Sequence, residues 1–234
     1  MNKKYDEYFA VHTDEYANAT LSKQSELYLN TSKIINDKIY GCNIVLDIGN
    51  GGVINYDYSH INRLDCGDLF VSGKAIETYA SKENISFFHA DVTNLVDIND
   101  NTYDVVIVQF VLHHLAAIKY YDTVENVRKA VHECMRVLKP KGKLLIIESV
   151  VVSWFERVQR LFYPLQCFLL SMIRFGLVYQ FSSKSLYKIV NSLSYRVITY
   201  KPVSIGKYVF ILGKFRLPTI ITPFRAVLIE VVNQ

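Results

Sequence analysis

Residues 43–52 read NIVLDIGNGG, and this stretch decides the fold class of the chain. A short apolar run, Ile44–Leu46, ends in Asp47, and three glycines follow close behind it. These glycines are Gly49, Gly51 and Gly52. A buried parallel strand that runs into a glycine loop is how an open α/β sheet builds a crevice for a nucleotide-sized ligand. Glycine lets the backbone approach the ligand where a Cβ would collide, and an acid at the strand end can hold polar groups of that ligand.

A second acid lies at the spacing that this interpretation needs. Asp68 follows Gly49 by 19 residues, where a second strand would present a carboxylate to ribose hydroxyls. Asp65 is the alternative for that role, and Asp68 would then cap a helix. The dinucleotide pattern G-x-G-x-x-G needs glycine at position 54, where the chain has Ile54. The third glycine of that pattern leaves room for a pyrophosphate, so the sequence predicts a ligand without one at this point.

Strands and helices alternate through about the first 150 residues, which is typical of a parallel sheet covered by helices. We therefore expect an α/β fold. The predicted strands are residues 43–48, 62–67, 85–89, 104–110, 143–148, 195–200 and 224–232. The predicted helices are residues 14–40, 73–82, 122–138 and 183–193. Lys139–Gly142 is expected to stop the third helix and turn the chain into the next strand.

Composition fits one globular enzyme. Half of the 234 residues are hydrophobic and 13% are aromatic, which is enough for a substantial core. The four cysteines are widely scattered, so no metal site and no disulfide framework is predicted, and a reducing cytosol is expected. The N-terminus, MNKKYDEYF, is polar and charged and does not have the pattern of a secretory signal peptide.

Charge is distributed unevenly along the chain. Eleven basic residues and no acidic residue lie between Glu156 and Glu230, whereas the remainder has 15 basic and 22 acidic residues. Such an imbalance favours an anionic partner: phosphate, nucleotide, nucleic acid or anionic lipid. The apolar stretch 154–181 falls in this region, but its longest uncharged run, Leu161–Ile173, is shorter than the roughly 20 residues of a membrane-spanning helix. Helices that cap a crevice or lie on a membrane surface are expected instead.

Five motifs in order, covering about Val45–Glu148, resemble those of the class I S-adenosylmethionine (SAM)-dependent methyltransferases. They are the glycine motif Asp47–Val53, Asp68 at the end of the second strand, His89–Val92, Tyr103–Leu115 and Arg136–Gly142. The resemblance implies a Rossmann-like, doubly wound seven-stranded sheet with an inserted helical cap. One methyltransferase domain is then expected to span the chain. Its parts are a helical lead-in (1–42), a SAM-binding core (43–150), a helical cap (151–193) and terminal strands (194–234).

The same resemblance implies SAM as the cofactor and places its contacts. Asp68 would bind the ribose hydroxyls and Asp91 would face the adenine amino group. Tyr16, in the lead-in, is a candidate to close over the cofactor. The full set of expected cofactor contacts is Asp47, Gly49, Asn50, Gly51, Asp68, Asp91, Val92 and Gln109.

Catalysis by such an enzyme makes few demands, because a methyl sulfonium is already an activated electrophile. The protein must hold donor and acceptor in line and, where needed, remove a proton, so no metal is required. The candidate bases are His113 and His114 after the fourth strand and Glu148 at the end of the fifth. The alternatives are that one histidine packs structurally and that backbone donors satisfy Glu148.

The expected acceptor is a small molecule or a lipid-linked one, and the basic C-terminal third predicts that it is anionic. Residues 213–224 are loosely similar to methyltransferases of bacterial glycan assembly, which implies O-methylation of a sugar nucleotide or lipid-linked glycan. A quinone or other lipid is the alternative acceptor, and a non-catalytic protein that binds SAM or a partner is the alternative function. A nucleic-acid substrate is not expected, because the basic residues are interleaved with apolar ones. The expected location is the cytoplasm, with peripheral contact at the inner face of the membrane.

Overall fold

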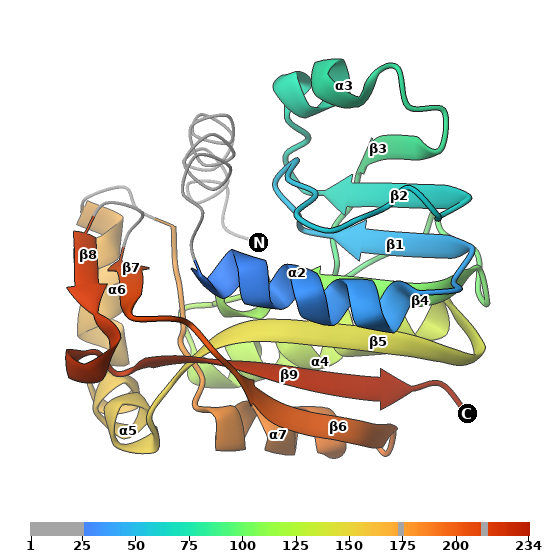
Figure 1. The fold of residues 1–234 in the computed structure, drawn as a ribbon. Coiled ribbons are helices and arrows are strands. Elements are labelled where there is room, and N and C mark those ends of the chain that lie inside the picture. The colour runs from blue at the N-terminus through green and yellow to red at the C-terminus, as the bar shows by residue number, and fades with distance from the viewer. Residues whose placement is uncertain (1–25, 173–175, 212–214) are drawn as a thin grey trace.

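The computed structural model describes residues 26–172, 176–211 and 215–234. Its centre is a seven-stranded sheet with the spatial order β3-β2-β1-β4-β5-β9-β6 (Figure 1). Neighbours among β1 to β5 pair in parallel, whereas β9 runs antiparallel to both β5 and β6. The strand order reverses between β1 and β4, which is where open α/β sheets bind their ligands. The strands are β1 (Ile44–Ile48), β2 (Arg63–Asp68), β3 (Ile85–His89), β4 (Tyr103–Gln109), β5 (Leu138–Val151), β6 (Arg196–Val203) and β9 (Phe224–Val232).

Helices cover both faces of the sheet, which confirms the predicted doubly wound α/β fold (Figure 1). Successive residues of a strand point to opposite faces. In β4, Val106 and Val108 pack in the cluster that contains α4 and α7, whereas Val105 and Ile107 pack in the cluster that contains α2. This double burial explains why β4 is an unbroken apolar run. The helices are α2 (Glu26–Ile39), α3 (Gly73–Tyr79), α4 (Tyr120–Arg136), α5 (Ser153–Leu161), α6 (Tyr163–Met172) and α7 (Ser183–Asn191).

The connection between β1 and β2 has no helix, although parallel neighbours are usually joined through one. Residues 49–62 instead form a loop that packs on α2. The Asp57 amide donates to Asn36 Oδ1 at 2.8 Å, and a ring nitrogen of His60 lies 3.3 Å from the Ile39 carbonyl oxygen. Helix α2, from the lead-in, therefore covers this face of the sheet together with the loop.

The turn predicted at Lys139–Gly142 is wrong, because β5 begins at Leu138 and includes this segment. Leu138 pairs with Tyr103 and Lys143 pairs with Val105, so the register shifts and the intervening residues bulge from the ladder. The bulge is held by the C-terminus. The Lys141 amide donates to the Asn233 carbonyl, and the Asn233 amide donates to the Gly142 carbonyl, each at 2.9 Å.

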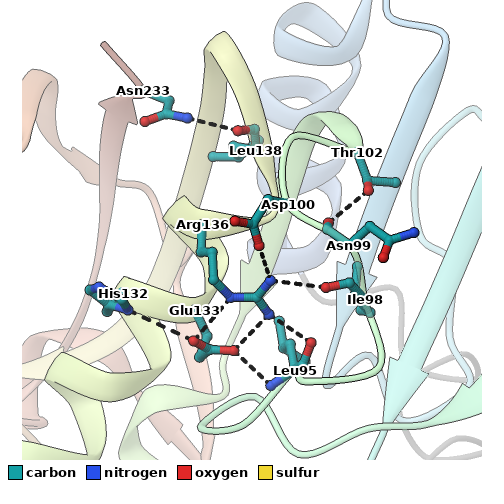
Figure 2. A network of polar contacts seen from close by, with 10 residues as sticks. All are labelled: Leu95, Ile98, Asn99, Asp100, Thr102, His132, Glu133, Arg136, Leu138 and Asn233. Carbon is teal, nitrogen blue, oxygen red and sulfur yellow. Dashed lines mark hydrogen bonds and ion pairs between the residues drawn. The ribbon is translucent and has the colours of Figure 1, made fainter.

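Arg136 ties the end of α4 to the long loop that follows β3 (Figure 2). Its guanidinium donates to the carbonyl oxygens of Leu95 at 2.7 Å and Ile98 at 2.9 Å. It also pairs with the Glu133 carboxylate at 2.9 Å, and that carboxylate accepts a bond from the Leu95 amide. The arginine of the Arg136–Gly142 motif is therefore structural, and it fixes the course of a loop that begins at the ligand-binding edge of the sheet.

The C-terminal third differs most from expectation. Helix α7 buries Leu186 and Val190 in the core beside α4, so it covers the sheet rather than forming part of a cap. A small two-stranded sheet, β7 (Tyr208–Ile211) with β8 (Phe215–Pro218), was not predicted. These strands lie with α5 and α6 at the left end of the molecule in Figure 1. No helix among the described residues is long and apolar enough to span a bilayer.

The remaining predicted elements agree with the structure to within a few residues at their ends. The short 3-10 helix η2 (Thr219–Ile221) occupies the loop expected between Pro218 and Pro223. Of the helix predicted over 14–40, the structure describes the part from residue 26 onward, and Tyr16 lies outside the described residues.

Candidate functional site

One cleft of about 730 Å³ opens at the carboxyl ends of the parallel strands. Residues at or just after the ends of β1, β2, β3 and β4 line it, together with the segment that follows β4, the start of α4 and the residues after α6. Its size is that of a small-molecule site. All eight residues expected to contact a cofactor contribute to the lining: Asp47, Gly49, Asn50, Gly51, Asp68, Asp91, Val92 and Gln109.

The glycine loop is shaped by close approaches that need residues without a side chain. Gly49 has a φ of +77°, and a Cβ built on it would lie 2.5 Å from Val111 Cγ2. Gly52 has a φ of +79°, and its Cβ would lie 2.6 Å from the Cβ of Ala75 in α3. The displaced third glycine of the motif thus gives α3 room to approach the loop. Both positions are strained for any other residue.

The structure separates the two candidates for the ribose-binding acid. The Asp68 carboxylate lies in the cleft and accepts bonds from the Gly51 and Phe70 amides, each at 2.9 Å. Asp65 lies outside the cleft lining, and its carboxylate accepts bonds from Ser86 at 2.7 Å and Tyr103 at 2.8 Å. A carboxylate has about four acceptor sites, so Asp68 can hold the loop and still receive ligand hydroxyls.

Asp47 is a buried carboxylate at the end of β1. Its Oδ2 accepts bonds from the Tyr56 hydroxyl at 2.9 Å and from the Asn50 amide at 3.3 Å. Its Oδ1 has no hydrogen-bond partner among the described residues. Desolvation raises the pKa of this group to about 7, and the two side-chain hydrogen bonds oppose that shift only in part. Asp47 therefore presents an unpartnered acceptor atom in a site that lines the cleft.

Two further predicted residues lie at the ends of β3 and β4. Asp91 Oδ1 accepts bonds from the amide and the hydroxyl of Thr93, at 2.8 and 2.7 Å, which shapes the turn that also carries Val92. Gln109 Nε2 donates to Thr31 Oγ1 at 3.2 Å. Because Thr31 belongs to α2, this bond fixes the lead-in helix against the strand end beside the cleft.

An aromatic pair completes this side of the cleft and was not predicted. Tyr28 of α2 and Phe110 after β4 both line the cleft, with their rings edge to face at a centroid distance of 5.7 Å. Phe110 adopts a left-handed backbone with a φ of +58°, which is a rare conformation for a residue with a side chain. Such strain gathers at functional sites. Nothing in the sequence distinguishes these two among the many aromatic residues of the chain.

Glu148 is placed as a structural acid rather than a base. It is buried and lies outside the cleft lining. Its Oε2 accepts a bond from the Leu112 amide at 2.6 Å, and its Oε1 accepts one from the Ser149 amide at 2.7 Å. Oε1 also lies 2.7 Å from His113 Nδ1. Glu148 thereby fixes the short 3-10 helix η1 (Leu112–His114), as the alternative from the sequence expected.

The two histidines occupy different places. Their rings stack at 4.0 Å, but only His114 contributes to the lining of the cleft. Burial lowers the pKa of His114 well below its usual value, and the neighbouring His113 lowers it further. His114 is therefore neutral at neutral pH. Of the three candidate bases, the geometry brings His114 to the cleft and leaves His113 and Glu148 behind it.

The far part of the cleft is mostly apolar. Leu115, Ala116, Ile118 and Leu177 contribute to it. Four carboxylates line the cleft as a whole, from Asp47, Asp68, Asp91 and Asp122, and none of its described lining residues is lysine or arginine. Within the described ranges, no group of three or more histidine, cysteine or acidic side chains is arranged to hold a metal ion.

Comparison with known proteins agrees with this architecture. Residues 46–146 match the family profile described as methyltransferase domain. A comparison with curated proteins finds no significant match. Among solved structures, the chain is similar to the methyltransferase bound to the Trm112 methyltransferase activator of Haloferax volcanii. The TM-score is 0.63 at 16% identity, covering 94% of this chain and 95% of that one.

Two similar structures hold ligands. One is 1,6-didemethyltoxoflavin-N1-methyltransferase from Burkholderia thailandensis with bound 1,6-didemethyltoxoflavin and S-adenosylhomocysteine, with a TM-score of 0.64, 13% identity and coverage of 100% and 92%. The other is the N-methyltransferase NodS from Bradyrhizobium japonicum with S-adenosylhomocysteine, with a TM-score of 0.56, 14% identity and coverage of 87% and 85%. At these identities the likeness establishes the fold, which is that of the class I methyltransferases.

We expect Glu148→Gln to lower the free energy of unfolding by about 1–3 kcal/mol. Both carboxylate oxygens accept backbone N–H groups, so either orientation of the glutamine amide sets an NH₂ against a donor. Urea denaturation measures the change. Glu77→Gln, an exposed acid on α3, is the control and should change stability by less than about 0.5 kcal/mol. Equal stability of the two variants would contradict the structural role of Glu148.

Asp47→Asn is expected to stabilise the unliganded protein as the pH rises. The folded pKa is raised above the unfolded value, so wild-type stability is lost between about pH 4 and pH 7 and stays low above pH 7. The asparagine variant lacks this loss, and its advantage should grow by up to about 1.4 kcal/mol per pH unit in that window. Urea denaturation at several pH values tests this.

The matched control for this experiment is Asp57→Asn. Asp57 is exposed, and hydrogen bonds from Ser59 lower its pKa, so its variant should lose rather than gain stability as the pH rises. Parallel pH profiles for wild type and Asp47→Asn would show that the Asp47 carboxylate is not destabilised by burial.

Proposed function

We propose that this chain, whose residues 46–146 form a methyltransferase domain, transfers the methyl group of SAM to a small-molecule acceptor. The observation that carries the proposal is the convergence of three carboxylates and a glycine loop on one cleft. The carboxylates are those of Asp47, Asp68 and Asp91. SAM supplies an activated methyl group on its sulfonium when it is bound.

The donors of SAM suit these residues in kind and in number. Its methionine part has an ammonium group, its ribose has two hydroxyls and its adenine has an amino group, and all of these donate hydrogen bonds. Asp47 would face the ammonium group with the oxygen that has no protein partner, because buried charges require pairing. Asp68 would hold the ribose, and Asp91 would lie toward the adenine. SAM has no pyrophosphate, in keeping with Ile54 in the glycine motif.

His114 is the residue that we propose acts on the acceptor. It lies in the cleft beside the apolar part that would receive this molecule, and its neutral ring can accept a proton from a hydroxyl or orient it. A lowered pKa makes it a weak base. It therefore suits an acceptor whose proton is readily lost. His113 and Glu148 would act only by fixing the position of η1.

The acceptor itself is better explained as a lipid or quinone than as a sugar nucleotide. The described lining offers no lysine or arginine to a phosphate, and the four carboxylates would repel one. Leu115, Ile118 and Leu177 instead favour an apolar molecule. An anionic group of a lipid-linked acceptor would have to remain outside this lining, where the basic residues of the C-terminal third are available.

Methyl transfer from isotopically labelled SAM in a cell extract, followed by mass spectrometry of the products, tests this function. The Haloferax volcanii relative was solved with an activator protein, so the extract should retain native partners of this chain. A labelled product that depends on added protein supports catalysis. Binding of SAM without any labelled product would support the alternative of a non-catalytic SAM-binding protein.

Asp68→Ala is expected to weaken binding of S-adenosylhomocysteine roughly tenfold to a hundredfold, equivalent to about 1.5–3 kcal/mol. The loss combines the ribose bonds with the support that Asp68 gives to the Gly51 amide. Titration calorimetry measures the affinity. Asp65→Asn is the control, because this side chain lies outside the cleft and should leave the affinity near that of wild type. The reverse result would move the ribose role to Asp65.

His114→Gln is expected to lower the methyl-transfer rate by about a hundredfold or more while the affinity for S-adenosylhomocysteine stays near that of wild type. Glutamine keeps a polar side chain but cannot take up a proton. His113→Gln, one residue away and outside the cleft lining, should retain more activity. Full turnover by His114→Gln would mean that catalysis rests on proximity alone.

A further inference from the structure

Helix α5 is oriented opposite to an ordinary surface helix. Its polar residues Glu156 and Gln159 are buried, at 7% and 9% exposure, and Glu156 accepts a bond from the Ser185 hydroxyl at 2.6 Å. Its apolar residues Trp154, Val158 and Leu161 face outward. A helix in water normally buries the apolar face. The inversion indicates that a partner outside the described part of the chain covers these side chains.

The apolar face continues along α6 at the same three- and four-residue spacing. Leu165, Phe168 and Met172 follow Leu161 in this pattern, and Trp154 and Val158 precede it. We call these six residues the exposed stripe, and their exposure runs from 47% to 74%. Contiguous apolar surface of this kind marks an interaction site.

A second apolar element lies beside the start of the exposed stripe. The Val152 amide, at the N-terminus of α5, donates to the Pro223 carbonyl at 3.0 Å, so η2 lies against this end of the helix. Ile220 and Ile221 of η2 are 88% and 71% exposed. Figure 1 shows α5, α6 and the β7–β8 pair gathered at the end of the sheet toward which β1 and β2 point. Gly176 and Leu177, just after α6, line the cleft.

The charge of this region indicates the chemistry of the partner. Residues 157–229 contain eleven basic and no acidic residues, and Arg157 and Arg160 of α5 are exposed beside the exposed stripe. A second copy of the chain would set like charges against one another in a two-fold interface. An anionic lipid surface accepts both the apolar side chains and the positive charge.

We propose that the exposed stripe, with η2, binds the surface of an anionic lipid bilayer and holds the cleft beside it. The side chains enter the boundary between headgroups and acyl chains, and Arg157 contacts the lipid phosphates. Bilayer binding does not depend on the proposed methyl transfer. The further consequence that a lipid-borne acceptor enters the cleft past Leu177 does rest on that function.

Vesicle flotation of the full chain tests the proposal. Vesicles of phosphatidylcholine mixed with phosphatidylglycerol should carry the protein upward at low salt and release it at high salt, and pure phosphatidylcholine should carry much less. Arg157→Gln should weaken binding about fivefold, and Leu161→Ser with Phe168→Ser at least tenfold. Ile76→Ser with Val96→Ser removes equally exposed apolar residues elsewhere and should leave binding unchanged.

Calorimetry with S-adenosylhomocysteine shows that each variant is folded and keeps the two proposals distinguishable. Failure of the wild type to float at low salt, with that ligand still bound, would overturn the bilayer proposal and leave the cofactor site intact. Equal binding to neutral and anionic vesicles would overturn the role of charge. A wild-type dimer in sedimentation that Leu161→Ser with Phe168→Ser converts to monomer, without flotation, would assign the surface to a second copy instead.

Discussion

The turn after β1 has to pass between Val111 and α3, and it can do so only because Gly49 and Gly52 have no Cβ. This passage sets the rest of the site. It brings the Gly51 amide to the Asp68 carboxylate, which joins the ends of β1 and β2. It also lets α3 approach the loop, in a protein that has no helix between these two strands. The cleft is therefore a consequence of backbone geometry before any ligand is considered.

The carboxylates of the site differ in how much stability they cost the protein. Asp68 and Asp91 accept backbone amides, so their placement is partly offset within the protein itself. Asp47 is buried with one oxygen that has no partner in the described chain, and its pKa rises to about 7. A cationic group beside that oxygen would favour the ionised form and remove the penalty. Destabilisation that a ligand relieves is a common property of binding sites.

The sequence predicted the features that depend on local pattern. The Asp47–Gly52 motif, the buried run at β4 and the amphipathic α4 each follow from residues close together in the chain, and the structure places them as expected. Features that depend on distant partners were missed or left open. The bulge at Lys139–Gly142 is held by Asn233, the strained backbone of Phe110 is matched by Tyr28, and Glu148 is used by the amide of Leu112. No local pattern encodes such pairings, because they arise only when the sheet brings both partners together.

The same distinction applies to charge. From the sequence, the basic C-terminal third and the acceptor appear to form a single problem, and an anionic acceptor follows. The structure separates them, because the described cleft lining is acidic and apolar while Arg157 and Arg160 lie on the outer helix α5. Net charge over a long segment describes the surface on which a protein acts, whereas the cleft is described by the few side chains that reach it. An enzyme built in this way can be drawn to an anionic surface by one set of residues and select an uncharged reacting group with another.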